Sequence, residues 1–210
     1  MKKILAGIAV LAVAAVAQAD LLATWTIAKS TINPVQNEKT EITFGDMVAN
    51  GLGNQTVETT AWRLTQWITD PGVVSGNSLD LPFTLQSGYQ FALESVKGSM
   101  NPNGNPSPVN FKWQNENGVD VTGSVNVKTT SPATWTALES APVWTSSGTL
   151  SLVAADGKNS AGNNASSGSR ADIKSGLEVY GTVTQVPEPA TMSLLGLGAL
   201  AMVIRRKLSK

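Results

Sequence analysis

The chain has 210 residues, with 15 basic and 15 acidic side chains and neither cysteine nor histidine. These two absences exclude disulfide bonds, Ser-His-Asp and Cys-His catalysis, and metal sites that depend on histidine. Six of the basic residues and Glu188 lie at the two ends, so residues 20–186 keep nine basic and fourteen acidic residues. The resulting net charge of −5 disfavours nucleic-acid binding, which needs a basic surface.

The N-terminus has the three parts of a secretory signal peptide. Lys2 and Lys3 precede an uncharged run, and Ala17-Gln18-Ala19 forms a small-x-small cleavage site before Asp20. A buried N-terminal helix is the weaker alternative, because the run has no polar face to turn to water. We therefore predict a signal peptide at residues 1–19, cleavage between Ala19 and Asp20, and export of the chain.

Residues 20–185 have the length of one domain and are rich in short β-branched or alternating segments between turn residues. The clearest strand is the last, in which Leu177, Val179, Gly181 and Val183 share one face and Gly181 permits a close contact or a bulge. Residues 60–69 suit a helix or a strand equally. Many short strands predict an antiparallel β-sandwich, an all-β fold. The predicted strands are Leu22–Ala28, Glu41–Met47, Leu81–Leu85, Tyr89–Lys97, Val109–Gln114, Val121–Lys128, Thr134–Leu138, Thr149–Ala154 and Leu177–Thr184.

Three segments between the predicted strands have turn or loop composition. Asn117-Gly118 predicts a hairpin turn between two of the strands. The Pro- and Asn-rich segment at 101–108 predicts a long exposed loop, and Gly157–Ser169, with small and polar residues, predicts a mobile loop.

Six tryptophans lie in the body, and their flat apolar rings suit either a core or a sugar-binding surface. Trp25 and Trp113 lie within apolar strands and are predicted core residues. The other four lie near polar or turn segments and are candidates for an exposed carbohydrate-binding cluster, although packing is the more common role. These four are Trp62, Trp67, Trp135 and Trp144.

Acidic residues offer weaker signals for chemistry. A glycosidase needs two carboxylates, but no spacing selects a pair among the five candidates. Two loops, Asn115–Asp120 and Asp156–Asn159, combine acids, Asn and Gly as calcium loops do, but neither matches the EF-hand pattern. We therefore predict no catalytic residues and no metal ligands. The five candidate acids are Glu94, Glu116, Asp120, Glu139 and Glu178.

The C-terminus combines a rigid motif, an apolar run and a basic tail. Pro187 and Pro189 hold the chain extended around Glu188, in the form that a processing enzyme accepts. Residues 190–204 carry no charge, and a 15-residue run is short for a membrane helix, which usually needs about 17–25 residues. The basic tail at 205–210, with Arg205, Arg206 and Lys207, is placed as the positive-inside rule requires. We predict a motif at 187–189, a single transmembrane helix at 190–204 and a stop-transfer tail after it.

The order Val186-Pro187-Glu188-Pro189-Ala190-Thr191, apolar run and basic tail resembles the PEP-CTERM sorting signal of exported proteins from Gram-negative bacteria that make exopolysaccharide. The resemblance implies processing by an exosortase, a membrane-embedded Cys-dependent enzyme, removal of the tail and delivery to the outer surface or extracellular matrix. It leaves the cut position within residues 186–190 open. The body is similar to jelly-roll, galactose-binding-like domains in Gly88-Tyr89, its Gly/Pro/Asn-rich loop and its last strand. Such domains often hold a structural calcium ion. The expectation of a calcium ion in this chain rests on this resemblance alone.

These features predict an exported, non-catalytic surface or matrix protein with a structural or adhesive role in an exopolysaccharide or biofilm layer. The domains are a signal peptide at 1–19, a β-sandwich at 20–185 and a sorting segment at 186–210. One alternative is a carbohydrate-binding module that uses exposed tryptophans. The other is a glycoside hydrolase with a carboxylate pair.

Overall fold

The computed structural model describes residues 19–27, 34–36, 39–57, 61–102, 107–130, 132–174 and 176–187. In these residues every regular element is a β-strand and the strands pair antiparallel. The predicted all-β antiparallel class is therefore confirmed. Residues 1–18 of the predicted signal peptide at 1–19 and the whole predicted transmembrane helix at 190–204 lie outside the described residues.

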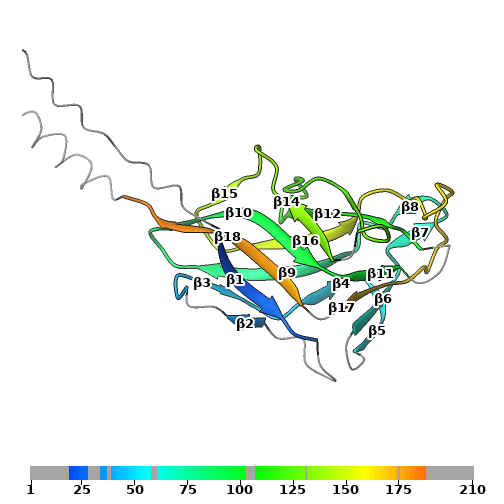
Figure 1. The fold of residues 1–210 in the computed structure, drawn as a ribbon, viewed down its shortest axis with the longest axis horizontal. Helices are drawn as coiled ribbons and strands as arrows, with labels where there is room; N and C mark the ends of the chain where they lie inside the picture. The colour runs from blue at the N-terminus through cyan, green and yellow to red at the C-terminus, as the bar shows by residue number, and fades with distance from the viewer. Residues whose placement is uncertain are drawn as a thin grey trace, which may run out of the picture.

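Two large sheets form the body (Figure 1). The terminal sheet, named for holding the first and last strands, has the order β14-β10-β18-β1-β2, with β15 also paired to β10. Its strands are β1 (Asp20–Trp25), β2 (Pro34–Gln36), β10 (Tyr89–Gly98), β14 (Ala133–Thr136), β15 (Val143–Trp144) and β18 (Leu177–Gln185).

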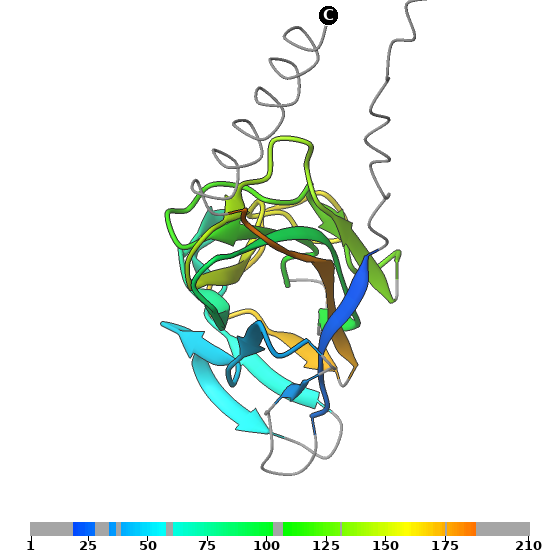
Figure 2. The same cartoon turned by 90° about the vertical axis from the view of Figure 1, so that its left-hand side faces the viewer.

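The second large sheet, called the polar-faced sheet, has the order β13-β12-β16-β9-β3, with β4 also paired to β9. Its strands are β3 (Ile42–Phe44), β4 (Val48–Asn50), β9 (Ser78–Leu85), β12 (Asn110–Asn115), β13 (Val125–Asn126) and β16 (Gly148–Ala154). Figure 2 shows the strands of the two sheets curving around a common centre.

Eight of these strands have the connectivity of a jelly roll, in which two four-stranded sheets exchange successive strands. One set is β1-β18-β10-β14 in the terminal sheet, and the other is β9-β16-β12-β13 in the polar-faced sheet. The short strands β2, β3, β4 and β15 extend these two sets. The structure thus confirms the predicted jelly-roll-like sandwich.

Connections of the jelly roll form a smaller third sheet with the order β11-β17-β6-β5, at the right of Figure 1. A separate two-stranded ribbon pairs β7 with β8. Asp172 of β17 is 4% exposed, lies opposite Arg63 and is hydrogen bonded to Arg170 through both of its oxygens. The strands are β5 (Gly53–Val57), β6 (Ala61–Thr65), β7 (Ile68–Asp70), β8 (Val73–Val74), β11 (Met100–Pro102) and β17 (Ala171–Lys174).

Aromatic side chains fill the space between the two large sheets. Phe91 of β10 lies 5.3 Å from the ring of Phe83 across the sandwich and stacks on Trp144 at the same distance. Trp25 of β1 meets Phe44 of β3 edge to face at 5.5 Å. Such edge-to-face and offset contacts are the favoured aromatic geometries, so the core joins the sheets by specific packing as well as by burial.

The last strand alternates as predicted, because Leu177, Val179 and Gly181 are buried while the residues between them are partly exposed. A Cβ on Gly181 would lie 2.4 Å from the carbonyl oxygen of Ala92. Both neighbouring strands carry an extra residue at this level, Leu22 in β1 and Glu94 in β10. The predicted close contact at Gly181 is confirmed, and bulges lie in the strands on both sides of it.

Each of the nine predicted strands has a counterpart, with two large differences in length. The predicted strand 121–128 shrinks to Val125–Asn126, because Trp113 O accepts hydrogen bonds from both Val121 and Thr122 and the ladder bulges there. The predicted strand 41–47 ends at Phe44. Gly45 N still donates to Pro82 O in the register of the pair, but Pro82 has no N–H with which to return the bond. Residues 61–65 and 68–70 form strands rather than a helix.

The structure describes only the ends of the predicted exposed loop at 101–108. Asn101 and Pro102 belong to β11 and Ser107 is fully buried, and residues 103–106 lie outside the described residues. The segment 157–169 is tied down by hydrogen bonds, from Ala165 N to Gly157 O and from Gly72 N to Ala165 O. A Cβ on Gly157 would lie 2.0 Å from the Gly72 carbonyl oxygen, so the loop packs against the backbone near β8 instead of standing free.

Candidate functional site

The predicted exposed tryptophan cluster is wrong. The exposed fractions of Trp62, Trp67, Trp135 and Trp144 are 2%, 0%, 0% and 5%. Their indoles pack between elements, and the Nε1–H of Trp135 donates to Phe111 O at 2.9 Å while that of Trp67 donates to Ala171 O at 3.4 Å. These four rings therefore offer no face on which a sugar could stack. Trp25 and Trp113 are buried as predicted.

The outer face of the polar-faced sheet carries a hollow of about 300 Å³. Alternation along the strands creates it, because Leu79, Leu81, Leu150 and Leu152 point into the core and leave the intervening polar residues outside. The register places Gln114, Ser151 and Asp80 in one row across three strands. The lining residues are Asn50, Gly76, Ser78, Asp80, Gln114, Asn115, Glu116, Gly118, Thr149, Ser151 and Val153.

One rim of the hollow is the hairpin predicted at Asn117-Gly118, which the structure confirms. Asn115 Oδ1 accepts the N–H groups of Asn117 and Val119 at 3.0 and 2.9 Å, and Gly118 adopts a φ of 74°. The positive φ suits glycine at this point of the turn. The side chain of Asn115 thus fixes the hairpin end that carries Glu116 over the hollow.

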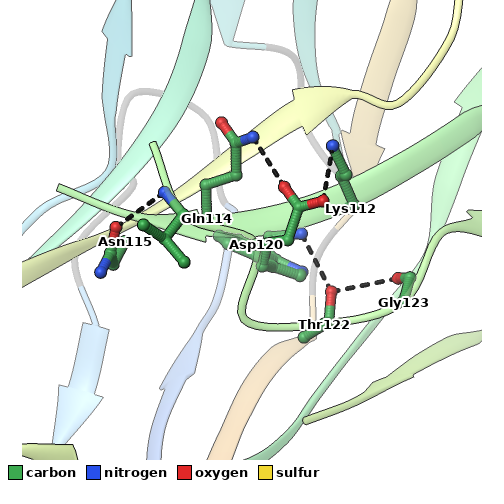
Figure 3. Close-up of polar contacts among 8 residues, drawn as sticks. Lys112, Gln114, Asn115, Asp120, Thr122 and Gly123 are labelled. Atoms are coloured by element: carbon green, nitrogen blue, oxygen red, sulfur yellow. Dashed lines mark hydrogen bonds and ion pairs between the residues drawn. The ribbon is translucent and has the colours of Figure 1, made fainter. Parts of the chain in front are cut away.

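The two arms of this hairpin are joined by a polar network (Figure 3). Asp120 accepts hydrogen bonds from Lys112 Nζ and from Gln114 Nε2, both at 2.8 Å. Partial desolvation acts to raise the pKa of Asp120, but the hydrogen bonds from Lys112 and Gln114 and the charge of Lys112 together hold it below its ordinary value. The positive charge of Lys112 is therefore balanced by Asp120 beside the hollow, and Gln114 is held in place by its amide nitrogen.

Asp120→Asn should weaken the protein near neutral pH and have less effect in acid. Because the folded-state pKa is lowered, the carboxylate contributes stability above the ordinary aspartate pKa of about 3.9, and that contribution is lost as the pH falls through the lowered value. The side chain is 42% exposed, so solvent screening keeps the effect below about 1 kcal/mol. Urea unfolding of both proteins between pH 3 and pH 7 measures the difference. The exposed Asp46, changed to Asn, serves as the control, and an Asp120→Asn effect independent of pH would contradict this account.

The candidate acids do not converge on one cleft of the described structure. Glu94 lies at the bulge of β10, and Glu178 of β18 accepts a hydrogen bond from Tyr180 Oη at 2.7 Å. Glu139 is exposed after β14. Only Glu116 and Asp120 share an element, the hairpin, and there Asp120 is already engaged by Lys112.

The two calcium-like loops use their oxygens internally. Asp156 accepts Lys158 N on Oδ1 and Asn110 Nδ2 on Oδ2, and the ammonium group of Lys158 bonds to Asn164 in the same loop. In the first loop Asn115 and Asp120 are engaged as described above. Within the described ranges no group of three or more acidic side chains gathers in a way that could hold a metal ion.

The described structure reaches the edges of both predicted processing sites. Asp20 already belongs to β1, lies opposite Gly181 and forms an ion pair with Lys39 at 3.0 Å. At the other end, Val186 N donates to Gly88 O at 2.8 Å, directly before Pro187. Glu188, Pro189 and the basic residues Arg205, Arg206 and Lys207 lie outside the described residues, and so does the Ala17-Gln18 part of the signal cleavage site. No helix in the part of the chain that the structure describes is long and apolar enough to cross a membrane.

Comparison with known proteins gives one match. Residues 185–207 match the family described as the PEP-CTERM protein-sorting motif. Neither the curated proteins nor the solved structures contain a match to this chain. The motif supports export, transient membrane anchoring and processing by an exosortase. The chain therefore carries a PEP-CTERM sorting signal at residues 185–207, which begins at the last residue of the last strand of an antiparallel all-β body.

Proposed function

We propose that this chain is a non-catalytic surface or extracellular-matrix protein whose jelly-roll body has a structural or adhesive role in an exopolysaccharide layer. The observation that carries the proposal is the sorting motif at residues 185–207, which begins where β18 ends. An exosortase removes the tail, and the folded body is the part that remains outside the cell.

The position of β18 supports the view that the body stays folded when the tail is removed. This strand lies in the middle of the terminal sheet, between β10 and β1. Its last paired residue is Gln185, and one more backbone hydrogen bond holds Val186. A cut within residues 186–190 therefore leaves the hydrogen-bonded ladder of the sheet whole.

A passive role also agrees with the chemistry of the acidic side chains. A glycoside hydrolase needs one carboxyl group with a raised pKa to act as general acid. Asp120, which accepts a hydrogen bond from the lining residue Gln114, instead has its pKa lowered by Lys112 and Gln114 against the opposing effect of desolvation. Nothing in this arrangement favours hydrolysis over binding.

Mass spectrometry of the C-terminal peptide from protein isolated at the native cell surface tests the proposal. We expect a C-terminus within residues 186–190 and recovery in the outer-surface or matrix fraction. A C-terminus at Lys210 in the inner-membrane fraction would make the chain a simple membrane-anchored protein, and the matrix role would be abandoned with the sorting route.

A further inference from the structure

We propose that the hollow on the polar-faced sheet is a binding site for an uncharged, hydroxyl-rich saccharide. The proposal deepens the matrix role and rests on it only in assuming that the exported body meets polysaccharide. Amide, carboxylate and hydroxyl groups of β4, β9, β12 and β16 would contact the saccharide, and the buried tryptophans would not.

The hydrogen-bonding capacity left in the hollow favours a ligand that donates. Ser78 Oγ donates to Asp80 Oδ1 at 2.7 Å, which leaves Asp80 Oδ2 without a donor among the described residues. The amide nitrogen of Gln114 donates to Asp120, so the side-chain carbonyl oxygen of Gln114 remains an acceptor. Thr149 and Ser151 add hydroxyl groups, which both donate and accept. Vicinal hydroxyls of a sugar match such a mixture of acceptors and hydroxyls.

The charge and polarity of the lining disfavour three other classes of ligand. Phosphate and sulfate groups need cationic partners, but the lining contains Asp80 and Glu116 and no basic residue. Lys112, two residues before Gln114 on β12, is paired with Asp120 at 2.8 Å. A metal ion is disfavoured because no group of three acidic side chains forms in the described structure. An apolar ligand would leave these polar groups unpaired.

The side chains around the hollow are held before any ligand arrives. Asp80 is fixed by Ser78, Gln114 by Asp120, and Glu116 Oε2 accepts Trp144 Nε1–H at 3.1 Å. Groups that are already ordered lose little conformational entropy on binding, so even weak hydrogen bonds contribute to affinity. The volume of about 300 Å³ is at the lower end for ligand sites and suits one or two sugar units of a longer chain.

Isothermal titration calorimetry on the full chain, purified in a polyoxyethylene detergent that contains no sugar, tests the site. The probes are cellohexaose, maltohexaose and N-acetylchitohexaose, each alone, with a chitosan hexamer and Ca²⁺ as charged comparators. We expect at least one neutral probe to bind, and we expect Asp80→Leu to weaken that binding at least tenfold. Ser151→Met, which extends a side chain into the hollow, should have a similar effect if Asp80→Leu disturbs folding.

Two exposed positions outside the hollow provide matched controls, Asp46→Leu for Asp80→Leu and Thr43→Met for Ser151→Met. The proposal is overturned if no neutral probe binds, if both hollow variants bind as the wild type does, or if only the chitosan hexamer or Ca²⁺ binds. The C-terminal mass measurement is independent of this titration. Binding without removal of the tail would overturn only the matrix role, and removal of the tail without binding would overturn only the saccharide site.

Discussion

Gly181→Val should lower the free energy of unfolding by about 2–4 kcal/mol and the melting temperature by roughly 5–15 °C. A Cβ at this position would lie 2.4 Å from the carbonyl oxygen of Ala92 and 2.7 Å from the ring of Phe91. The first contact is with backbone in the neighbouring strand, which cannot turn aside as a flexible side chain could. Thermal and urea unfolding of the purified protein measure the loss.

Gly123→Val is the matched control, because no atom lies within 4 Å of a Cβ at that position and its backbone does not need a positive φ. We expect the control to stay within about 0.5 kcal/mol of the wild type. An equal loss in both variants would mean that the effect comes from the replacement of glycine by valine in general rather than from the contact with Ala92.

The size of the expected loss follows from where Gly181 lies. It faces Leu93 on one side and Asp20 on the other, and each neighbouring strand has its bulge beside it. A displacement of β18 there disturbs two ladders at once. Because β18 joins the first strand of the body to the long strand β10, the substitution should weaken the whole terminal sheet.

The sequence was sufficient to predict the features that depend on local periodicity. The alternation of apolar and polar residues predicts β18 and its inner face. Asn117-Gly118 predicts the hairpin that borders the hollow. Both depend on residues that are close in the chain, where side-chain direction and turn geometry follow directly from residue type. The jelly-roll order, by contrast, came from a resemblance and needed the strand pairings to establish it.

Polar neighbours in the sequence are a misleading sign of exposure for the four tryptophans predicted to form a cluster. Trp62 alternates with Leu64, and both are buried on one face of β6, so period-two alternation could have revealed it. Trp135 alternates with Ala133 in the same way. No comparable signal existed for Trp144, since β15 has only two residues and its burial comes from Phe83 and Phe91, which are far away in the chain.

The hollow could not be predicted, because it is assembled by strand register. Asn50, Asp80, Gln114 and Ser151 come from four strands spread over a hundred residues. In the sequence each is an ordinary polar residue on the outer side of a strand. The third sheet escaped prediction for a related reason, since its strands have three to five residues and are stabilised by pairing with distant segments.

The second large effect is expected at the junction between body and tail. Replacement of Pro187, Glu188 and Pro189 by alanine should leave the body folded and abolish processing. The body ends its hydrogen bonding at Val186, so the three substitutions remove no strand pairing. They do remove two prolines, a residue type that favours an extended chain, and the carboxylate between them. These are the features of the matched sorting motif closest to the body.

We therefore expect the triple alanine variant to keep its C-terminus at Lys210 and to accumulate in the inner-membrane fraction, while the wild-type chain loses the tail. C-terminal mass spectrometry and fractionation distinguish the two, and an unchanged melting temperature shows that the body is intact. Pro132→Ala with Glu139→Ala, at exposed positions of the body, is the control and should be processed normally. Normal processing of the triple variant would mean that the apolar run and basic tail alone direct the enzyme. The Pro-Glu-Pro motif would then have no part in recognition.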